Sequence, residues 1–174
     1  MITIRPATEA DRDAIWTIFR EVLAPGDTYA LDPNMSPEDA LAYWFAPGTN
    51  AYVAEFDRLK QSSLQPMIGV AGTYILRPNQ SGGGSHVANA PFMVSSNARG
   101  QGIGRAMAEH CLSEARRLGF LAMQFNFVIS TNTSAIHLWQ ELGFKIVGTL
   151  RGAFRHPERE YVDVYVMYRS LFED

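Results

Sequence analysis

Hydrophobic residues recur along this chain with two periods, and segments of the two kinds follow one another in a regular order. Alternation and short apolar runs predict seven strands, over residues 2–5, 50–56, 67–76, 91–94, 121–128, 145–150 and 162–170. Apolar residues spaced three and four apart predict four helices, over residues 8–22, 36–45, 101–118 and 132–143. The predicted order is β-α-α-β-β-β-α-β-α-β-β, an α/β (α+β) fold.

Capping residues and turn-forming segments support these boundaries. Ser36 followed by Pro37 is typical of a helix start, and Gly119 and Gly143 are placed to end two helices. Three connecting segments are rich in turn residues, at 24–35, 57–66 and 79–85. The last contains three consecutive glycines, and we interpret it as a mobile hairpin loop between two paired strands.

Length and composition exclude several classes of protein. The 174 residues suit one domain spanning 1–174, and 47% hydrophobic content is typical of a globular chain. A net charge of −3 argues against a nucleic-acid partner, and no apolar run is long enough for a membrane span. The start, MITIRPAT, reads as a strand rather than a signal peptide, so we expect a cytoplasmic location and no membrane association.

The histidines and the single cysteine give no sign of a metal or a thiol nucleophile. No two histidines have zinc-ligand spacing, so we expect no metal. Cys111 falls among apolar residues of the third predicted helix, where a core thiol is expected.

The most informative segment is the strand–loop–helix corner at 89–105, NAPFMVSSNARGQGIGR. Glycines at a helix start let a ligand approach the exposed N–H groups, which favour phosphate oxygens. No Lys-Ser or Lys-Thr follows the glycines, which excludes a mononucleotide P-loop. The G-x-G-x-x-G spacing of dinucleotide sites also fails. A nucleotide-binding protein is therefore disfavoured, and the remaining pattern is R-x-x-G-x-G.

A second segment, residues 132–144, has the pattern N-x-x-A-x-x-L-[YW]-x-x-L-G-F. Together, in this order and separation, the two segments resemble the GNAT superfamily of acyl-CoA-dependent N-acyltransferases. The resemblance implies a GNAT-like mixed, mostly antiparallel central sheet of about seven strands flanked by about four helices. It also implies acetyl transfer from acetyl-CoA to a primary amine, by direct attack in a ternary complex.

The resemblance assigns a set of residues to the cofactor. Pro91 lacks an N–H and predicts a bulge that separates its strand from the strand at 121–128. In the family such a gap admits the pantetheine arm, whereas the alternative is a bulge that only bends the sheet. The implied cofactor-binding residues are Phe92, Met93, Val94, Arg99, Gly100, Gln101, Gly102, Ile103, Gly104, Arg105, Asn132 and Ala135.

The catalytic residues are less well defined, and three are candidates. Trp139 stands where many members carry a tyrosine that protonates the departing thiolate, but an indole N–H is not a useful proton source. We therefore interpret Trp139 as a core aromatic residue that faces the pantetheine. His86 and Glu55 are candidate bases, with a plain strand-start histidine and an exposed strand-end charge as the respective alternatives.

By analogy with the family, the acceptor groove is flanked by residues of the first interhelical loop and of the final strands. These candidates are Asp27, Tyr29, His156, Tyr161 and Asp163. The absence of an evident acidic run favours a small-molecule amine over a basic peptide. A non-catalytic acyl-CoA-binding sensor or regulatory module is the alternative, and the frequent dimers of the family leave a homodimer open.

Overall fold

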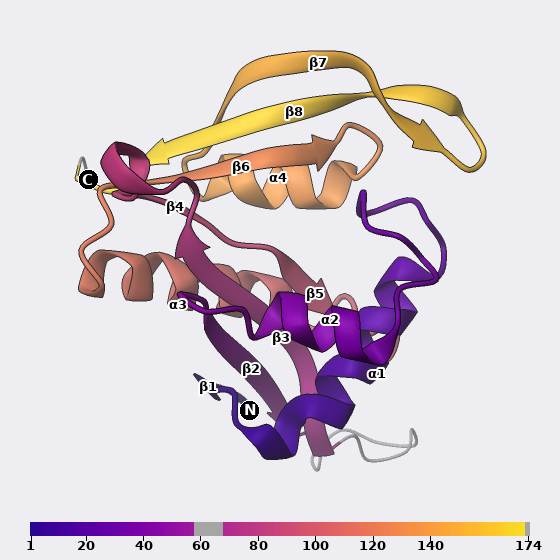
Figure 1. The fold of residues 1–174 in the computed structure, drawn as a ribbon, viewed down its shortest axis with the longest axis vertical. Coiled ribbons are helices and arrows are strands. Elements are labelled where there is room, and N and C mark those ends of the chain that lie inside the picture. The colour runs from indigo at the N-terminus through magenta and orange to yellow at the C-terminus, as the bar shows by residue number, and fades with distance from the viewer. Residues whose placement is uncertain (58–67, 173–174) are drawn as a thin grey trace.

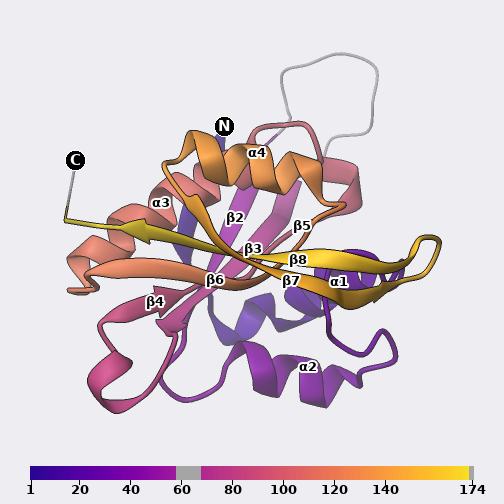
Figure 2. The same ribbon diagram turned by 90° about the horizontal axis from the view of Figure 1, so that it is seen from above.

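The computed structural model describes residues 1–57 and 68–172. Most of the polar loop predicted at 57–66 lies outside the described residues. An eight-stranded sheet runs through the molecule in the order β1-β2-β3-β4-β6-β8-β7, with β5 paired to β3 beside this path. Figures 1 and 2 show the sheet between two helical layers, with α1 and α2 on one side and α3 and α4 on the other.

The first part of the sheet is antiparallel and is formed by β1 (Ile2–Pro6), β2 (Asn50–Asp57) and β3 (Ile68–Pro78). The helices α1 (Arg12–Leu23) and α2 (Pro37–Trp44) cover one face of it. Ser36 caps α2 as predicted, because its Oγ accepts a hydrogen bond of 3.1 Å from the N–H of Asp39.

The opposite face of the same strands packs against α3 (Ile103–Arg117). Alternation along β2 explains the two layers, since Tyr52 and Ala54 pack toward α3 whereas Val53 packs toward α1. Cys111 is fully buried in the α3 layer, and burial raises the pKa of its thiol. The prediction of a core thiol is confirmed.

The second part of the sheet contains β6 (Ala122–Ile129), β7 (Lys145–His156) and β8 (Glu160–Ser170), with α4 (Thr133–Glu141) after β6. The last two strands are longer than predicted, because residues 151–156 and 160–161, which lie between the two predicted strands, are also in strand conformation. His156 pairs with Glu160 across a short turn. Residues 151–161 are rich in charged residues and contain a glycine and a proline, a composition typical of loops. Strands pair through backbone N–H and carbonyl groups, however, so charged side chains do not prevent the pairing.

The strand that contains Pro91 is divided into two pieces. β4 (Val87–Asn89) pairs in parallel with β6 and antiparallel with β3, whereas β5 (Phe92–Val94) pairs only with β3. The predicted separation from β6 therefore occurs at Pro91, which also explains why the sheet has eight strands rather than seven. The pairing of β3 with β4 confirms that residues 79–85 lie inside a hairpin connection.

No helix in the described part of the chain has the length and apolar character that a membrane crossing requires.

Candidate functional site

The loop between β5 and α3 has the geometry of an anion-binding corner. It begins with a short 3-10 helix, Ser96–Ala98, and ends at Gly102, the N-cap of α3. Gly100 and Gly102 have φ of +73° and +79°, a backbone conformation that disfavours residues with a Cβ. A Cβ on either glycine would meet no atom within 4 Å, so the space beside this backbone is open. The first turn of α3 has N–H groups without helical partners, and the open backbone beside them is a place where an anion can approach.

Glu21 of α1 fixes the start of this loop, and sequence analysis did not identify it. One carboxylate oxygen, Oε2, accepts hydrogen bonds from the Oγ of Ser95 at 3.0 Å and from the N–H of Ser96 at 3.2 Å. The contact joins residues more than seventy positions apart, so no local pattern could have revealed it. Glu21 anchors the turn that leads from β5 into the glycine loop.

The arginines near the loop differ in their surroundings. Arg99 is exposed at the loop, and among the described residues it forms no ion pair. Arg105 instead pairs through its side chain with Glu141 of α4 and does not line the cavity beside the loop. Gln101 is exposed and does not line the cavity beside the loop.

A cavity of about 410 Å³ extends from the glycine loop into the gap beside β5. Most of the predicted cofactor-binding residues line it together with residues of α1 and α4. The lining residues are Val22, Thr28, Phe92, Met93, Val94, Ala98, Arg99, Gly100, Gly102, Ile103, Gly104, Asn132, Ser134, Ala135, Leu138 and Trp139. Ten of the twelve predicted cofactor positions are thus brought together, with Gln101 and Arg105 as the exceptions.

The unpaired edge of β5 faces this gap. The carbonyl of Pro91 and the N–H of Ser95 both bond to β3. Because the bonding direction alternates along an antiparallel strand, the polar groups of Phe92 and Val94 point away from β3. The hydroxyl of Tyr29 binds both backbone groups of Phe92, which leaves the N–H of Val94 as the free donor at this edge. Burial raises the pKa of Tyr29 well above its ordinary value.

A second cavity, of about 300 Å³, lies among the first interhelical loop, the start of β5 and the end of β6. It is lined by Thr28, Tyr29, Ala30, Leu31, Tyr43, Arg77, Asn89, Ala90, Pro91, Phe92, Phe125, Asn126, Phe127, Val128, Ile129, Asn132, Ala135 and Trp139. Five residues line both cavities: Thr28, Phe92, Asn132, Ala135 and Trp139. The two cavities therefore meet where β5, α4 and the first interhelical loop come together.

Trp139 lines both cavities at this junction and belongs to an aromatic cluster. Its ring lies 5.0 Å from that of Phe92 and 4.7 Å from that of Phe125, measured between centroids, and only 8% of Trp139 is exposed. Asn132 caps α4 by accepting a hydrogen bond of 3.4 Å from the N–H of Ala135. The placement fits the interpretation of Trp139 as a core aromatic residue that faces the cofactor cavity.

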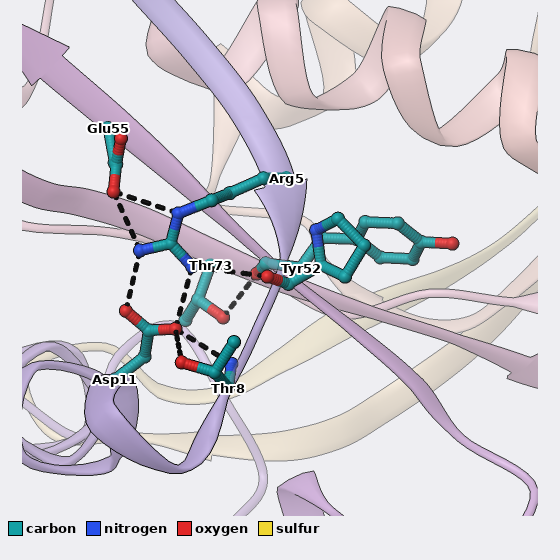
Figure 3. A network of polar contacts seen from close by, with 7 residues as sticks. Arg5, Thr8, Asp11, Tyr52, Glu55 and Thr73 are labelled. Carbon is teal, nitrogen blue, oxygen red and sulfur yellow. Dashed lines mark hydrogen bonds and ion pairs between the residues drawn. The ribbon is translucent and has the colours of Figure 1, made fainter.

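Glu55 is not brought to either cavity, and the structure gives it another partner (Figure 3). The Arg5 guanidinium donates to Glu55 Oε1 at 2.6 and 2.9 Å and to both carboxylate oxygens of Asp11 at 2.8 Å. Thr8 donates to Asp11 through its N–H and its hydroxyl. Glu55 therefore belongs to an ion-pair network that joins β1 and β2 to the start of α1, an arrangement that fits the alternative of a strand-end charge.

The other predicted site residues outside the cavities lie in three places. His86 is exposed before β4, where its carbonyl accepts from the N–H of Leu121, which favours the strand-start interpretation. Asp27 accepts from the hydroxyl of Thr28 at 2.9 Å but does not line either cavity, unlike its neighbour Tyr29. His156 and Tyr161 lie on the β7–β8 hairpin, and neither lines these cavities. In that hairpin, Asp163 accepts from the N–H of Gly152 and pairs with Arg151.

Within the described part of the chain, no Asp, Glu or His side chain lines either cavity, and no group of such side chains could hold a metal ion. The charged residues that line them are Arg99 in the larger and Arg77 in the smaller. Sequence analysis missed Arg77 and Tyr43, because a lone arginine in β3 and a tyrosine in α2 carry no motif.

Comparisons with known proteins agree with this geometry. Residues 14–144 match the model of the Acetyltransferase (GNAT) family. The N-acetyltransferase aca1 of Schizosaccharomyces pombe is 33% identical over 148 residues, which cover 81% of this chain and 71% of that protein. A GCN5-related N-acetyltransferase from Kribbella flavida is 41% identical, with a TM-score of 0.87 and 97% of each chain covered. A putative acetyltransferase from Salmonella typhimurium, yncA, solved with acetyl-CoA, has the same fold at 24% identity, with a TM-score of 0.82 over 100% of this chain and 96% of that one.

The fold, the glycine loop beside a split strand and these relatives define an acetyltransferase enzyme. This chain belongs to the GNAT acetyltransferase family. The resemblance to the GNAT superfamily, the fold class and the prediction of an enzyme, all made from the sequence, are confirmed.

Proposed function

We propose that the protein transfers an acetyl group from acetyl-CoA to the amine of a small molecule. The observation that carries the proposal is the junction of the two cavities, one beside the glycine loop and one between the start of β5 and the end of β6. Two compartments that meet at five shared residues fit a donor and an acceptor held together in one complex. The volume of the acceptor cavity, about 300 Å³, suits a small molecule.

The glycine loop and the edge of β5 fit acetyl-CoA. Arg99 and the N–H groups of the first turn of α3 hold the pyrophosphate, since both offer donors and positive charge to its oxygens. The pantetheine amides lie along the free edge of β5 at Val94, in the gap left by Pro91. The relatives support this assignment, since the Salmonella neighbour was solved with acetyl-CoA.

Bound acetyl-CoA supplies the thioester carbon that the amine attacks. The N–H of Val94 stabilises negative charge that develops on the thioester oxygen, because the pairing of β5 with β3 fixes the strand that carries this donor. The C–N bond forms as the C–S bond breaks, the nitrogen loses its proton to water, and CoA leaves as a thiolate. A thiol pKa of about 8.5 makes that departure compatible with neutral pH without a protein acid.

Because neither cavity presents an Asp, Glu or His side chain among the described residues, the amine enters in its neutral form. The protein then contributes position and a fixed hydrogen-bond donor rather than a side-chain base. Holding two reactants in attack geometry supplies a large part of the rate in such reactions.

The proposal is tested by following thiol release from acetyl-CoA with a panel of amines, amino acids and polyamines. Amine-dependent release with intersecting double-reciprocal lines supports direct attack in a ternary complex. Parallel lines indicate an acetyl-enzyme and contradict that part of the proposal. Binding of acetyl-CoA without release for any amine favours the non-catalytic sensor or regulatory module instead. A homodimer and a cytoplasmic location stay predictions, and light scattering of the purified protein tests the first.

A further inference from the structure

The acceptor cavity contains an arginine that has no carboxylate partner among the described residues. Arg77, near the end of β3, lines this cavity and is half-buried. It donates a hydrogen bond of 3.0 Å to the hydroxyl of Tyr43, and its guanidinium carbon lies 4.9 Å from the centre of that ring. Among the ion pairs formed by residues 1–57 and 68–172, none includes Arg77.

The other lining side chains do not offset this charge. The remaining polar residues of the cavity are Thr28, Tyr29, Asn89, Asn126 and Asn132, all neutral. A half-buried guanidinium is partly desolvated, and an anion placed beside it recovers that cost. The cavity therefore attracts an anionic group and repels a second cation.

Tyr43 fixes the orientation of the guanidinium. A guanidinium has five N–H donors, of which one binds the Tyr43 hydroxyl, and its central carbon lies over the Tyr43 ring. The remaining donors lie at the edge of the plane, where they match the two oxygens of a carboxylate or the oxygens of a phosphonate. Asn89 of β4 pairs with Arg77 of β3, and its side-chain amide donates a hydrogen bond to the carbonyl of Gln124.

The cavity that Arg77 lines is small and meets the cofactor cavity. Arg77 lines the cavity of about 300 Å³, and Phe92 lines both cavities. A small molecule that fills this cavity therefore lies between the guanidinium and the cofactor cavity.

We propose that the acceptor is a small amine that also carries an oxyanion, such as a carboxylate or phosphonate, and that Arg77 binds this anion at the end of the cavity away from acetyl-CoA. This inference rests on the proposed function, and it sets amino acids and related acids apart from polyamines and neutral amines. Arg77 is a specificity-determining residue and takes no part in the bond-making step.

The first test needs no variant and compares three forms of each acceptor in the wild-type protein. The panel contains L-amino acids, their amides, and the amines that remain when the carboxylate is removed. We expect kcat/KM to be about 100-fold higher for the acids, since each neutral form leaves the guanidinium unpaired. Equal or higher kcat/KM for the amides or the decarboxylated amines overturns the inference while leaving the proposed transferase in place.

The second test uses Arg77→Gln and Arg77→Lys, with Arg159→Gln as the matched control because Arg159 is exposed and outside both cavities. Arg77→Gln should raise KM for the acids by about 100-fold, change kcat little, and leave the amides nearly unaffected. Arg77→Lys should recover part of the preference, since it keeps the charge without the bidentate geometry. An equal loss for acids and amides contradicts the inference.

A binding measurement separates failure of this inference from failure of the proposed function. Thermal shift is recorded with CoA and each amino acid, its amide or its decarboxylated amine, without any turnover. A shift for the acids that Arg77→Gln abolishes supports anion binding by Arg77. If thiol release is absent with every amine, the proposed function fails, whereas amine-dependent release without an acid preference removes only the role of Arg77.

Discussion

The hydroxyl of Tyr29 binds both backbone polar groups of Phe92, accepting from the N–H at 3.0 Å and donating to the carbonyl oxygen. Tyr29 comes from the loop between α1 and α2, and Phe92 is the first residue of β5. One side chain thus completes the pairing of the strand at the place where β6 has separated from it. Because this contact occupies the polar groups of Phe92, the unpaired backbone groups of β5 that face the cofactor cavity are those of Val94.

Tyr29→Phe tests the importance of this contact. The variant keeps the ring but leaves the N–H and the carbonyl of Phe92 without a partner, which costs about 1–3 kcal/mol in the free energy of unfolding. We expect lower kcat as well, since β5 carries the donor at Val94. Urea unfolding and steady-state kinetics measure both quantities. Tyr161→Phe is the control, because Tyr161 is 70% exposed and lines neither cavity; equal effects of the two substitutions would contradict the prediction.

Gly102→Ala tests whether the glycine loop depends on backbone conformation rather than on space. Gly102 has φ of +79°, yet a Cβ there would meet no atom within 4 Å. The strain of a left-handed alanine, about 1–2 kcal/mol, should therefore act alone and displace the start of α3. We expect the Kd for CoA to rise about tenfold, as measured by calorimetry.

Gly83→Ala, in the connection between β3 and β4, is a matched control for Gly102→Ala. Gly83 is another exposed loop glycine beside which a Cβ would meet no atom within 4 Å, but its φ is not in the left-handed region. We expect no change in CoA affinity for this variant. A similar loss of affinity in both glycine variants would mean that the conformation of Gly102 is not what the cofactor site requires.

Parts of the site could be predicted because their causes are local in the sequence. The missing N–H of Pro91 predicted the split strand, and the spacing of the glycines predicted the corner before α3. Glu55, by contrast, was a candidate base with an exposed strand-end charge as the alternative, because its sequence context shows only a carboxylate near a strand end. Its partner, Arg5, lies fifty positions away and is brought beside it by the pairing of β1 with β2.

The wall of the acceptor cavity could not be predicted for the same physical reason. Arg77 and Tyr43 meet because α2 packs across β3, and neither residue has a sequence pattern that indicates the other. In the β7–β8 hairpin, by contrast, a local pattern was present but predicted strands that were too short. Its exposed and charged residues resemble a loop, but Phe154 and Val164 pack in a small buried cluster that holds the two strands together.

Asp11→Asn tests the ion-pair network shown in Figure 3. Hydrogen bonds from Arg5 hold the pKa of Asp11 well below its ordinary value. The carboxylate therefore stabilises the folded state at pH values above its unfolded pKa of about 3.9, and this contribution is lost as the pH falls further. We expect Asp11→Asn to lower the free energy of unfolding at pH 7 by about 2–3 kcal/mol.

The difference between wild type and Asp11→Asn should shrink at pH 3 and below, as measured by urea unfolding across the pH range. Asp13→Asn is the control, since Asp13 is exposed on the same helix. Its difference from wild type should be small at every pH. A difference for Asp11→Asn that stays constant down to pH 2 would show that the carboxylate charge does not contribute.

The absence of Asp, Glu and His from the described walls of both cavities leads to a prediction about the pH dependence of the rate. If no side chain takes the proton from the amine, kcat/KM should rise with pH until the free amine is neutral. The apparent pKa of that rise then belongs to the acceptor and not to the protein. Two acceptors whose amine pKa values differ by about two units should give profiles displaced by about the same amount.

Measurement of thiol release from pH 6 to 10 with such a pair distinguishes the two origins. A protein base would give both acceptors one common pKa in addition to that of each amine, and His86→Gln would remove it if His86 were that base. We expect the displacement to follow the acceptor and His86→Gln to leave the profile unchanged, because His86 lies exposed before β4 and lines neither cavity. A shared pKa that survives a change of acceptor would show that the protein supplies a base which the described walls do not contain.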